Sequence, residues 1–241
     1  MFDLKNVKGI IFDYGGTIDS NGKHWAEVLW ESYQDQGVPV TREQFREAYV
    51  YGERHLATHP IVQPEHNYYD LLKIKVDLQI HYLIEKGFLT KDCKFGDYIL
   101  GVSNQCYTFV RDLISAEIPY LIQLKQKYPM VLVSNFYGNV QAVIQDFGLL
   151  PFFDDIIESA VVGVRKPDPA IFAMGVDKLG LPASEIVVIG DSYAKDIVPA
   201  THIGCKTIWL KGLGWEKDDE AATADVVITD FMELKDIFQL A

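Results

Sequence analysis

Short apolar runs that end in a polar residue constrain the fold of this sequence most. The three clearest occupy residues 10–12, 131–133 and 186–190, and they lead into Asp13, Ser134 and Asp191. Such uninterrupted runs are typical of strands buried on both faces of a parallel sheet, whereas a half-exposed strand alternates apolar and polar residues. Further strands are predicted at 156–157, 207–210 and 226–228.

Helix-like segments alternate with these runs after about residue 117. They are predicted at 119–128, 139–147, 169–179, 195–202 and 231–238. Alternation of this kind predicts an α/β core, in which a doubly wound (Rossmann-like) parallel sheet is built with right-handed crossovers.

The segment between the first strand and residue 113 has a different pattern. Its apolar residues recur at helical spacing, as in 25–33 and 68–84, and none of its runs resembles a buried strand. We therefore predict an α-helical cap domain at 18–113, inserted into a core domain made of 1–17 and 114–241.

Charge limits the partners that this chain can bind. The 34 acidic residues outnumber the 22 basic ones, so the formal net charge is -12. This surplus repels nucleic acids and anionic membranes, and no uncharged run approaches the roughly 18 residues that a membrane span needs. We expect a cytoplasmic protein, a monomer or homodimer, that binds neither nucleic acid nor membrane and keeps its three scattered cysteines reduced.

The polar residues at the strand ends predict a phosphoryl site. Parallel strands present their carboxyl ends at one edge, so Asp13, Ser134 and Asp191 should face one another, with Asp196 close by. Three carboxylates in one place repel unless a cation such as Mg²⁺ lies among them. Lys166 would add a second positive charge. One carboxylate could then attack phosphorus while the cations and the hydroxyl stabilise its oxygens.

Four segments in order resemble the motifs of the haloacid dehalogenase-like (HAD) hydrolase superfamily. They are FDYGGT at 12–17, VSN at 133–135, VRKPDP at 164–169 and IGDSYAKDI at 189–197. The resemblance extends over the whole core. The predicted insertion also matches the subgroup whose α-helical cap follows the first motif.

This resemblance implies a Mg²⁺-dependent phosphatase for a small phosphorylated metabolite, with Asp13 as the nucleophile that forms an aspartyl-phosphate and Lys166 as its catalytic partner. The implied phosphate-binding residues are Gly16, Ser134, Asn135 and Lys166. The implied metal ligands are Asp13, the backbone carbonyl of Gly15, Asp191 and Asp196.

Gly15 departs from the superfamily pattern, because most of its phosphatases have a second Asp there as the general acid and base. Loss of such a group costs about 10²- to 10⁴-fold in rate. The substrate could have a good leaving group, as an acyl phosphate does, or another residue could supply the proton. The candidate donors are Asp19, His24, His55 and His59.

Two different functions also stay open. The chain could be a catalytically impaired phospho-ligand-binding or regulatory protein. It could also be a phosphonatase-like hydrolase that uses Lys23, Lys73 or Lys75 of the cap as a Schiff base. A dehalogenase is less favoured, because it would not need the carboxylates of Asp191 and Asp196 for a metal.

Overall fold

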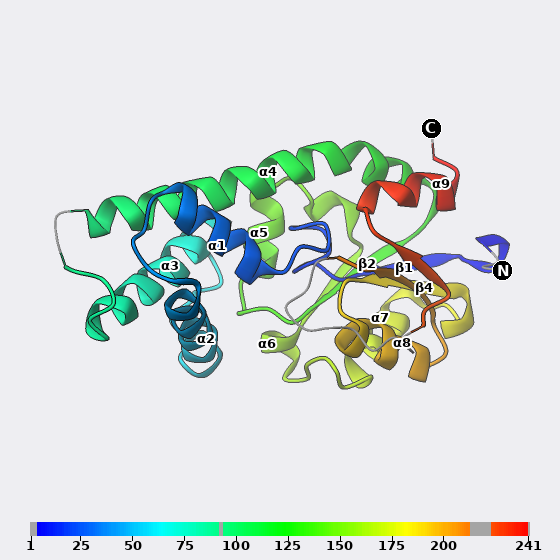
Figure 1. The fold of residues 1–241 in the computed structure, drawn as a ribbon. Helices are drawn as coiled ribbons and strands as arrows, with labels where there is room; N and C mark the ends of the chain where they lie inside the picture. Colours follow the sequence, from blue (N-terminus) through cyan, green and yellow to red (C-terminus); the bar gives the residue numbers. More distant parts are fainter. Residues whose placement is uncertain (1–3, 92–93, 213–222, 241) are drawn as a thin grey trace.

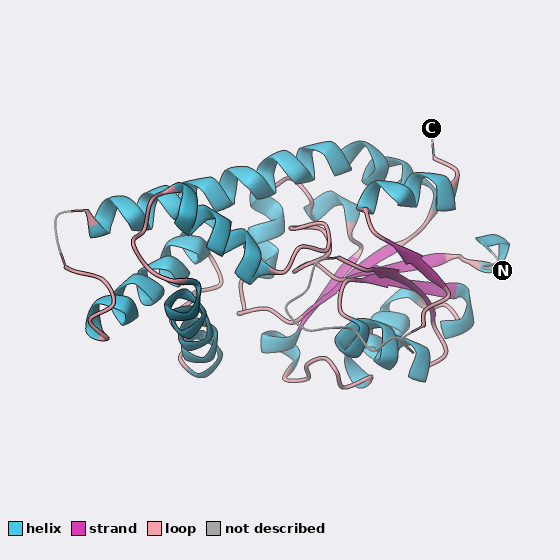
Figure 2. Ribbon diagram, in the orientation of Figure 1, coloured by secondary structure: helices cyan, strands magenta, loops and turns pink. Residues whose placement is uncertain are grey.

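The computed structural model describes residues 4–91, 94–212 and 223–240. Its centre is a six-stranded sheet in which every strand pair is parallel, with the order β3-β2-β1-β4-β5-β6 (Figures 1 and 2). The strands are β1 (Gly9–Phe12), β2 (Met130–Ser134), β3 (Asp155–Glu158), β4 (Ile186–Gly190), β5 (Lys206–Leu210) and β6 (Val226–Ile228). All six predicted strands and the predicted α/β class are confirmed.

Alternate side chains of β1, β2 and β4 enter two separate cores. Ile10 and Phe12 of β1 belong to the core shared with α4 (Phe95–Lys127), α5 (Val140–Asp146) and α9 (Leu234–Phe238). Ile11 lies in the core on the other face. That second core is shared with α7 (Ala170–Leu179) and α8 (Val198–His202). Since helices cover both faces, these strands have no polar side to expose, and the uninterrupted apolar runs follow.

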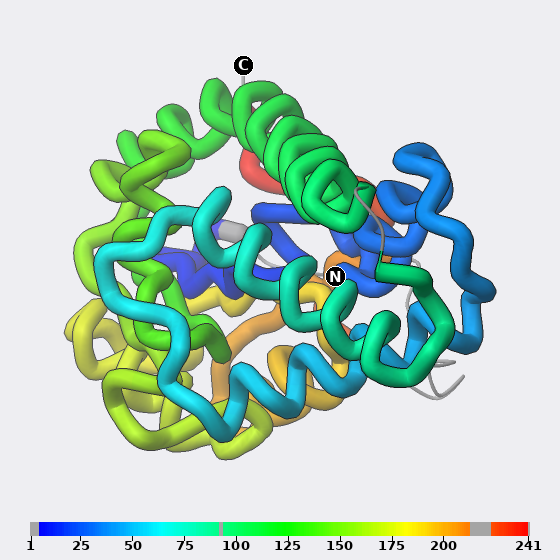
Figure 3. Tube along the Cα trace, turned by 90° about the vertical axis from the view of Figure 1, so that its left-hand side faces the viewer, coloured from blue at the N-terminus to red at the C-terminus, as the bar shows by residue number. Residues whose placement is uncertain are grey.

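The cap is helical, as predicted. It contains α1 (Trp25–Asp35), α2 (Arg42–Thr58) and α3 (Tyr68–Glu85), and the described residues between β1 and α4 form no strand. Polar side chains fix where these helices begin: His24 caps α1, Thr41 and Gln44 form a capping box on α2, and Asn67 caps α3. Figure 3, viewed from the cap side, shows α2 and α3 in front of the core part of the chain.

Helix α4 is longer than predicted and joins the cap to the core. The prediction began a helix at Pro119, but the helix starts at Phe95 and Pro119 lies inside it. Its buried side chains run along one side of the helix, from Val102 in the cap half to Leu124 in the core half. This continuous packing outweighs the hydrogen bond that the proline removes. The proposed domain boundary at 113/114 falls within this helix.

The other predicted helices are present with small differences. The segment predicted at 195–202 is a π-helical turn (Tyr193–Ile197) followed by α8, and 231–238 begins as a 3₁₀ turn (Phe231–Glu233) before α9. A short helix, α6 (Ser159–Val162), follows β3.

Two of the predicted reduced cysteines, Cys106 and Cys205, are buried free thiols, and burial raises the pKa of each to about 12. Cys93 lies outside the described residues, as does the acidic surface loop that the sequence predicts at 215–222. None of the helices in the described parts of the chain is both long and apolar enough to cross a membrane.

Candidate active site

The candidate site lies where the strand order reverses. From β1 the chain builds the sheet outward through β2 and β3, then returns to the other side of β1 for β4. Ligands of open α/β sheets bind at this switch, beyond the carboxyl ends of the strands. A cavity of about 850 Å³ opens there, lined by Asp13, Lys166 and Asp191 of the core and by His24 and Arg54 of the cap.

Both carboxylate oxygens of Asp13 are held in place. Oδ1 accepts a hydrogen bond from Lys166 Nζ at 2.5 Å, and Oδ2 accepts one from Thr17 Oγ1 at 3.0 Å. Burial raises the pKa of Asp13 to about 6, and Asp196 adds to the effect while Lys166 opposes it. The Thr17 hydroxyl thus positions the predicted nucleophile, although its place in the sequence is equally typical of a helix cap.

Lys166 bridges two carboxylates. Its Nζ also lies 2.7 Å from Asp196 Oδ1, and only 3% of the residue is exposed. Burial disfavours its charge, but Asp13 and Asp196 outweigh burial and raise the pKa of Lys166. Asn135 holds the backbone of this lysine twice: its Nδ2 donates to the carbonyl at 3.0 Å, and its Oδ1 accepts from the N–H at 2.9 Å. The Asn135 side chain therefore positions Lys166.

Three carboxylates converge beside this lysine. Asp13, Asp191 and Asp196 each offer an oxygen, and these oxygens lie within 4.8 Å of one another. Burial, and then the charges of Asp13 and Asp196, raise the pKa of Asp191 well above its usual range. Like Asp13, Asp196 uses both of its oxygens, because the second one accepts from Ser192 N–H at 3.0 Å. This all-oxygen set suits a hard divalent cation such as Mg²⁺, whose charge would relieve the repulsion.

Glycine is required at two positions beside the carboxylates. Gly16 has φ of +97°, and a Cβ there would lie 2.4 to 2.6 Å from carboxylate atoms of Asp191. A Cβ on Gly190 would lie as close to Asp196. Gly15 differs, since nothing lies within 4 Å of the position that its Cβ would take. The site therefore has room for a side chain where the superfamily has its second Asp.

Ser134 is a buried hydroxyl without a partner among the described residues. The residue is 1% exposed, and its Oγ makes no hydrogen bond there. A buried polar group left unsatisfied costs about 1–3 kcal/mol. A phosphoryl oxygen at the end of β2 would accept this hydrogen bond.

The candidate proton donors occupy different places. His24 and His59 line the cavity beside Asp13. Asp19 is 1% exposed and lies beneath the site, where Gly16 N–H, Trp25 Nε1 and Tyr68 OH donate to it at 2.7, 2.9 and 3.1 Å. Burial outweighs these donors and raises the pKa of Asp19 to about 7. Asp19 therefore connects the loop after β1 to α1 and α3.

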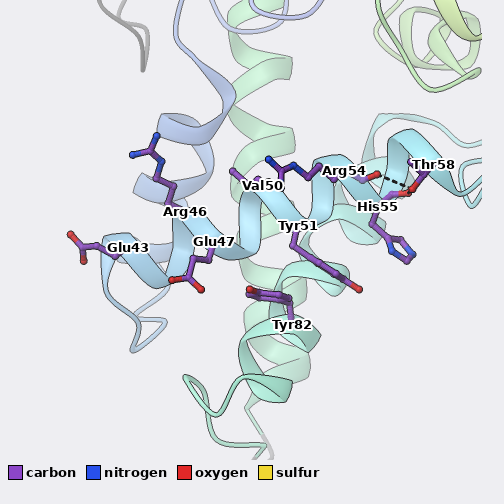
Figure 4. A pocket seen from close by; sticks show the side chains of 9 residues that line it. All are labelled: Glu43, Arg46, Glu47, Val50, Tyr51, Arg54, His55, Thr58 and Tyr82. Atoms are coloured by element: carbon purple, nitrogen blue, oxygen red, sulfur yellow. Dashed lines mark hydrogen bonds between the residues drawn. The ribbon is translucent and has the colours of Figure 1, made fainter.

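His55 lines another cavity, of about 750 Å³, together with side chains of α2 and α3 (Figure 4). Tyr51 of α2 stacks there on Tyr82 of α3 with ring centroids 4.6 Å apart. Asp13 does not line this second cavity.

None of the three candidate cap lysines lines the cavity that contains Asp13. Lys23 pairs with Glu31, Lys73 lies 3.0 Å from Asp70 Oδ1, and Lys75 lies 2.9 Å from Glu53 Oε1. Although burial opposes it, Glu53 raises the pKa of Lys75, whereas a Schiff base needs a neutral amine. This geometry gives no support to a phosphonatase.

Comparison with known proteins identifies the family. A model of haloacid dehalogenase-like hydrolases matches residues 7–204. A phosphoglycolate phosphatase of Photobacterium profundum is 31% identical over 244 residues, which cover 100% of both chains. A glyceraldehyde 3-phosphate phosphatase of Methanocaldococcus jannaschii is 41% identical over 91 residues, which cover 37% of this chain and 40% of the relative.

Coverage limits what these relatives say about function. Three of the curated relatives are matched over only 38%, 40% and 60% of their own length. The structure of the HAD hydrolase YfnB from Bacillus subtilis, bound to magnesium, has a TM-score of 0.60 and 22% identity, and the match covers 96% of this chain and 98% of that one. At this identity the likeness shows the shared fold.

Proposed function

We propose that this chain, which belongs to the haloacid dehalogenase-like hydrolase family, is a Mg²⁺-dependent phosphatase for a small phosphorylated metabolite. One observation carries the proposal: Asp13, fixed by Lys166 and Thr17, lies in one cluster with the carboxylates of Asp191 and Asp196. Relatives that are named as phosphatases of small metabolites support this choice of chemistry.

In the proposed reaction an oxygen of Asp13 attacks phosphorus, and the bond between phosphorus and the leaving oxygen breaks. Lys166 and the Ser134 hydroxyl donate to the phosphoryl oxygens as charge shifts toward them. Water then attacks phosphorus, releases inorganic phosphate and restores the Asp13 carboxylate. A bound Mg²⁺, held by Asp13, the Gly15 carbonyl and Asp191 with help from Asp196, would supply further neutralising charge.

The leaving group decides how fast the first step can be. Gly15 supplies no acid, and the carboxylate of Asp19 is buried beneath the site with three donors of its own. We therefore expect substrates with good leaving groups to react fastest. His24 and His59, which line the cavity, remain the candidates to protonate a poorer leaving group.

A phosphatase assay with two activated substrates tests the proposal. Hydrolysis of p-nitrophenyl phosphate and acetyl phosphate is measured with Mg²⁺ and with a chelator, for the wild type, Asp13→Asn and the exposed control Asp177→Asn. We expect activity that requires Mg²⁺, disappears in Asp13→Asn and persists in the control. A silent wild type would favour a phospho-ligand-binding protein, and an active Asp13→Asn would exclude Asp13 as the nucleophile.

A further inference from the structure

The cavity contains four carboxylates, and a cation can be assigned to neutralise each. They are Glu53 of the cap and the core residues Asp13, Asp191 and Asp196. Lys166 contacts Asp13 and Asp196 and balances one of the three core charges, and the proposed Mg²⁺ would balance the other two. Glu53 pairs with Lys75 at 2.9 Å and also accepts a hydrogen bond from Tyr137 OH at 2.6 Å. The cavity therefore needs no further cations to neutralise its own acids.

Three more cationic residues nevertheless line this cavity. Arg54 comes from α2 of the cap, Arg165 from the core loop that contains Lys166, and Lys195 from the π-helical turn that contains Asp196. Among the residues that the structure describes, no carboxylate lies within salt-bridge distance of any of the three. In a chain with a net charge of -12, this leaves a surplus of three positive charges where the substrate would bind.

The three cationic residues lie on different walls of the cavity. Arg165 and Lys195 precede Lys166 and Asp196 in the chain and line the cavity from the core side, where the phosphoryl group would bind. Arg54 lies on the cap wall of this cavity and also lines the second cavity. In Figure 4 its guanidinium points away from the Tyr51 and Tyr82 rings. An arginine fork binds planar carboxylates through two parallel hydrogen bonds, which a lysine cannot do.

From this charge surplus we propose that the substrate is a phosphorylated carboxylic acid whose carboxylate is bound by Arg54; this inference rests on the proposed phosphatase function. A phosphate monoester dianion and one carboxylate carry three negative charges, which equal the charges of Arg54, Arg165 and Lys195 together. A neutral phosphorylated alcohol would leave one cation unmatched. A bisphosphate would bring one negative charge too many.

Two nearly isosteric substrates test the inference. In 2-phosphoglycolate a carboxylate replaces the methyl group of ethyl phosphate, so the ratio of their kcat/KM values reports recognition of the carboxylate. We expect a ratio of about tenfold or more at low salt, which falls as salt screens the exposed cations. Arg54→Ala should lower the ratio toward one, and Arg54→Lys should restore part of it. Lys235→Ala, an exposed lysine of α9 outside the cavity, should leave the ratio unchanged.

The same comparison is made by binding, so that it does not depend on turnover. Calorimetry on Asp13→Asn with Mg²⁺ should show tighter binding of 2-phosphoglycolate than of ethyl phosphate, and Arg54→Ala in that background should remove the difference. Equal binding of the two ligands overturns the inference, as does a preference for ethylene glycol bisphosphate over 2-phosphoglycolate. Failure to hydrolyse p-nitrophenyl phosphate would instead count against the phosphatase function alone.

Discussion

The carboxyl edge of the sheet and the cap wall of the cavity are built in opposite ways. At the sheet edge, Asp13, Lys166 and Asp196 are at most 4% exposed, and each makes two hydrogen bonds to neighbouring groups. On the cap wall, Arg54 and His59 are exposed. Rigid, buried groups suit the transfer of a phosphoryl group, whose geometry is fixed, whereas exposed side chains suit the choice of substrate.

Among the proposed variants, Lys166→Met should damage the buried site at the carboxyl edge of the sheet most. It removes the cation shared by Asp13 and Asp196 while keeping a side chain of similar length. We expect phosphatase activity to fall by about 10²- to 10³-fold or more, and stability to fall by about 3–5 kcal/mol. Urea unfolding and assays with acetyl phosphate measure the two effects.

Lys178→Met is the control for a lysine ion pair. Lys178 lies 2.7 Å from Asp155, but its side chain is 52% exposed. We expect a loss of less than about 1 kcal/mol. Equal losses of stability in the two variants would contradict the buried role of Lys166.

Gly15→Asp does the opposite of Lys166→Met, because it adds a carboxylate to the carboxyl edge of the sheet. Because nothing lies within 4 Å of the future Cβ, we expect the chain to accept the aspartate. If proton transfer limits the rate, hydrolysis of unactivated esters should rise by about 10²-fold or more, while acetyl phosphate gains little. An unchanged ester rate would mean that His24, His59 or another group already acts as the acid.

Asp19→Asn tests the connection between the catalytic loop and the cap. An amide cannot accept from Gly16, Trp25 and Tyr68 together, because its NH₂ must face one of these donors. We expect a stability loss of about 1–3 kcal/mol in urea unfolding, since that donor stays buried and unsatisfied. The exposed Asp112→Asn should change stability by less than about 0.5 kcal/mol. A stable Asp19→Asn would show that these contacts contribute little.

Apart from the control variants, Tyr137→Phe has the smallest expected effect. It removes the hydrogen bond between the core and Glu53 of the cap but keeps the ring over Lys75, whose Nζ lies 4.7 Å from the ring centroid. We expect a stability loss of about 1–2 kcal/mol. The urea midpoint measures it, and a midpoint equal to that of the wild type would contradict a stabilising role for this contact.

The sequence predicted the residues at the carboxyl edge of the sheet better than those on the cap wall of the cavity. Parallel strands bring their carboxyl ends together whatever lies between them in the chain, so Asp13, Ser134 and Asp191 could be placed from three short runs. Arg54 could not be placed in this way. Helical periodicity indicates which face of α2 is buried, but not how the cap lies on the core.

The roles of two residues near the carboxyl edge of the sheet could be assigned only from the structure. Asp19 follows the first motif closely enough to suggest a proton donor, yet its partners also include Trp25 of α1 and Tyr68 of α3, the latter 49 residues away in the chain. The family resemblance makes Gly16 a predicted phosphate-binding residue. Only its distance to Asp191 shows that a side chain there would displace a predicted metal ligand.

The most direct test of the account is to trap phosphate on Asp13. Since Gly15 leaves the second step without its usual base, the aspartyl-phosphate should accumulate when ³²P-labelled acetyl phosphate is added with Mg²⁺ and the reaction is quenched with acid. We predict a label that is bound to the protein, is released by hydroxylamine and is absent from Asp13→Asn. Turnover by the wild type without such a label, or a label that persists in Asp13→Asn, would contradict the assignment of Asp13 as the nucleophile.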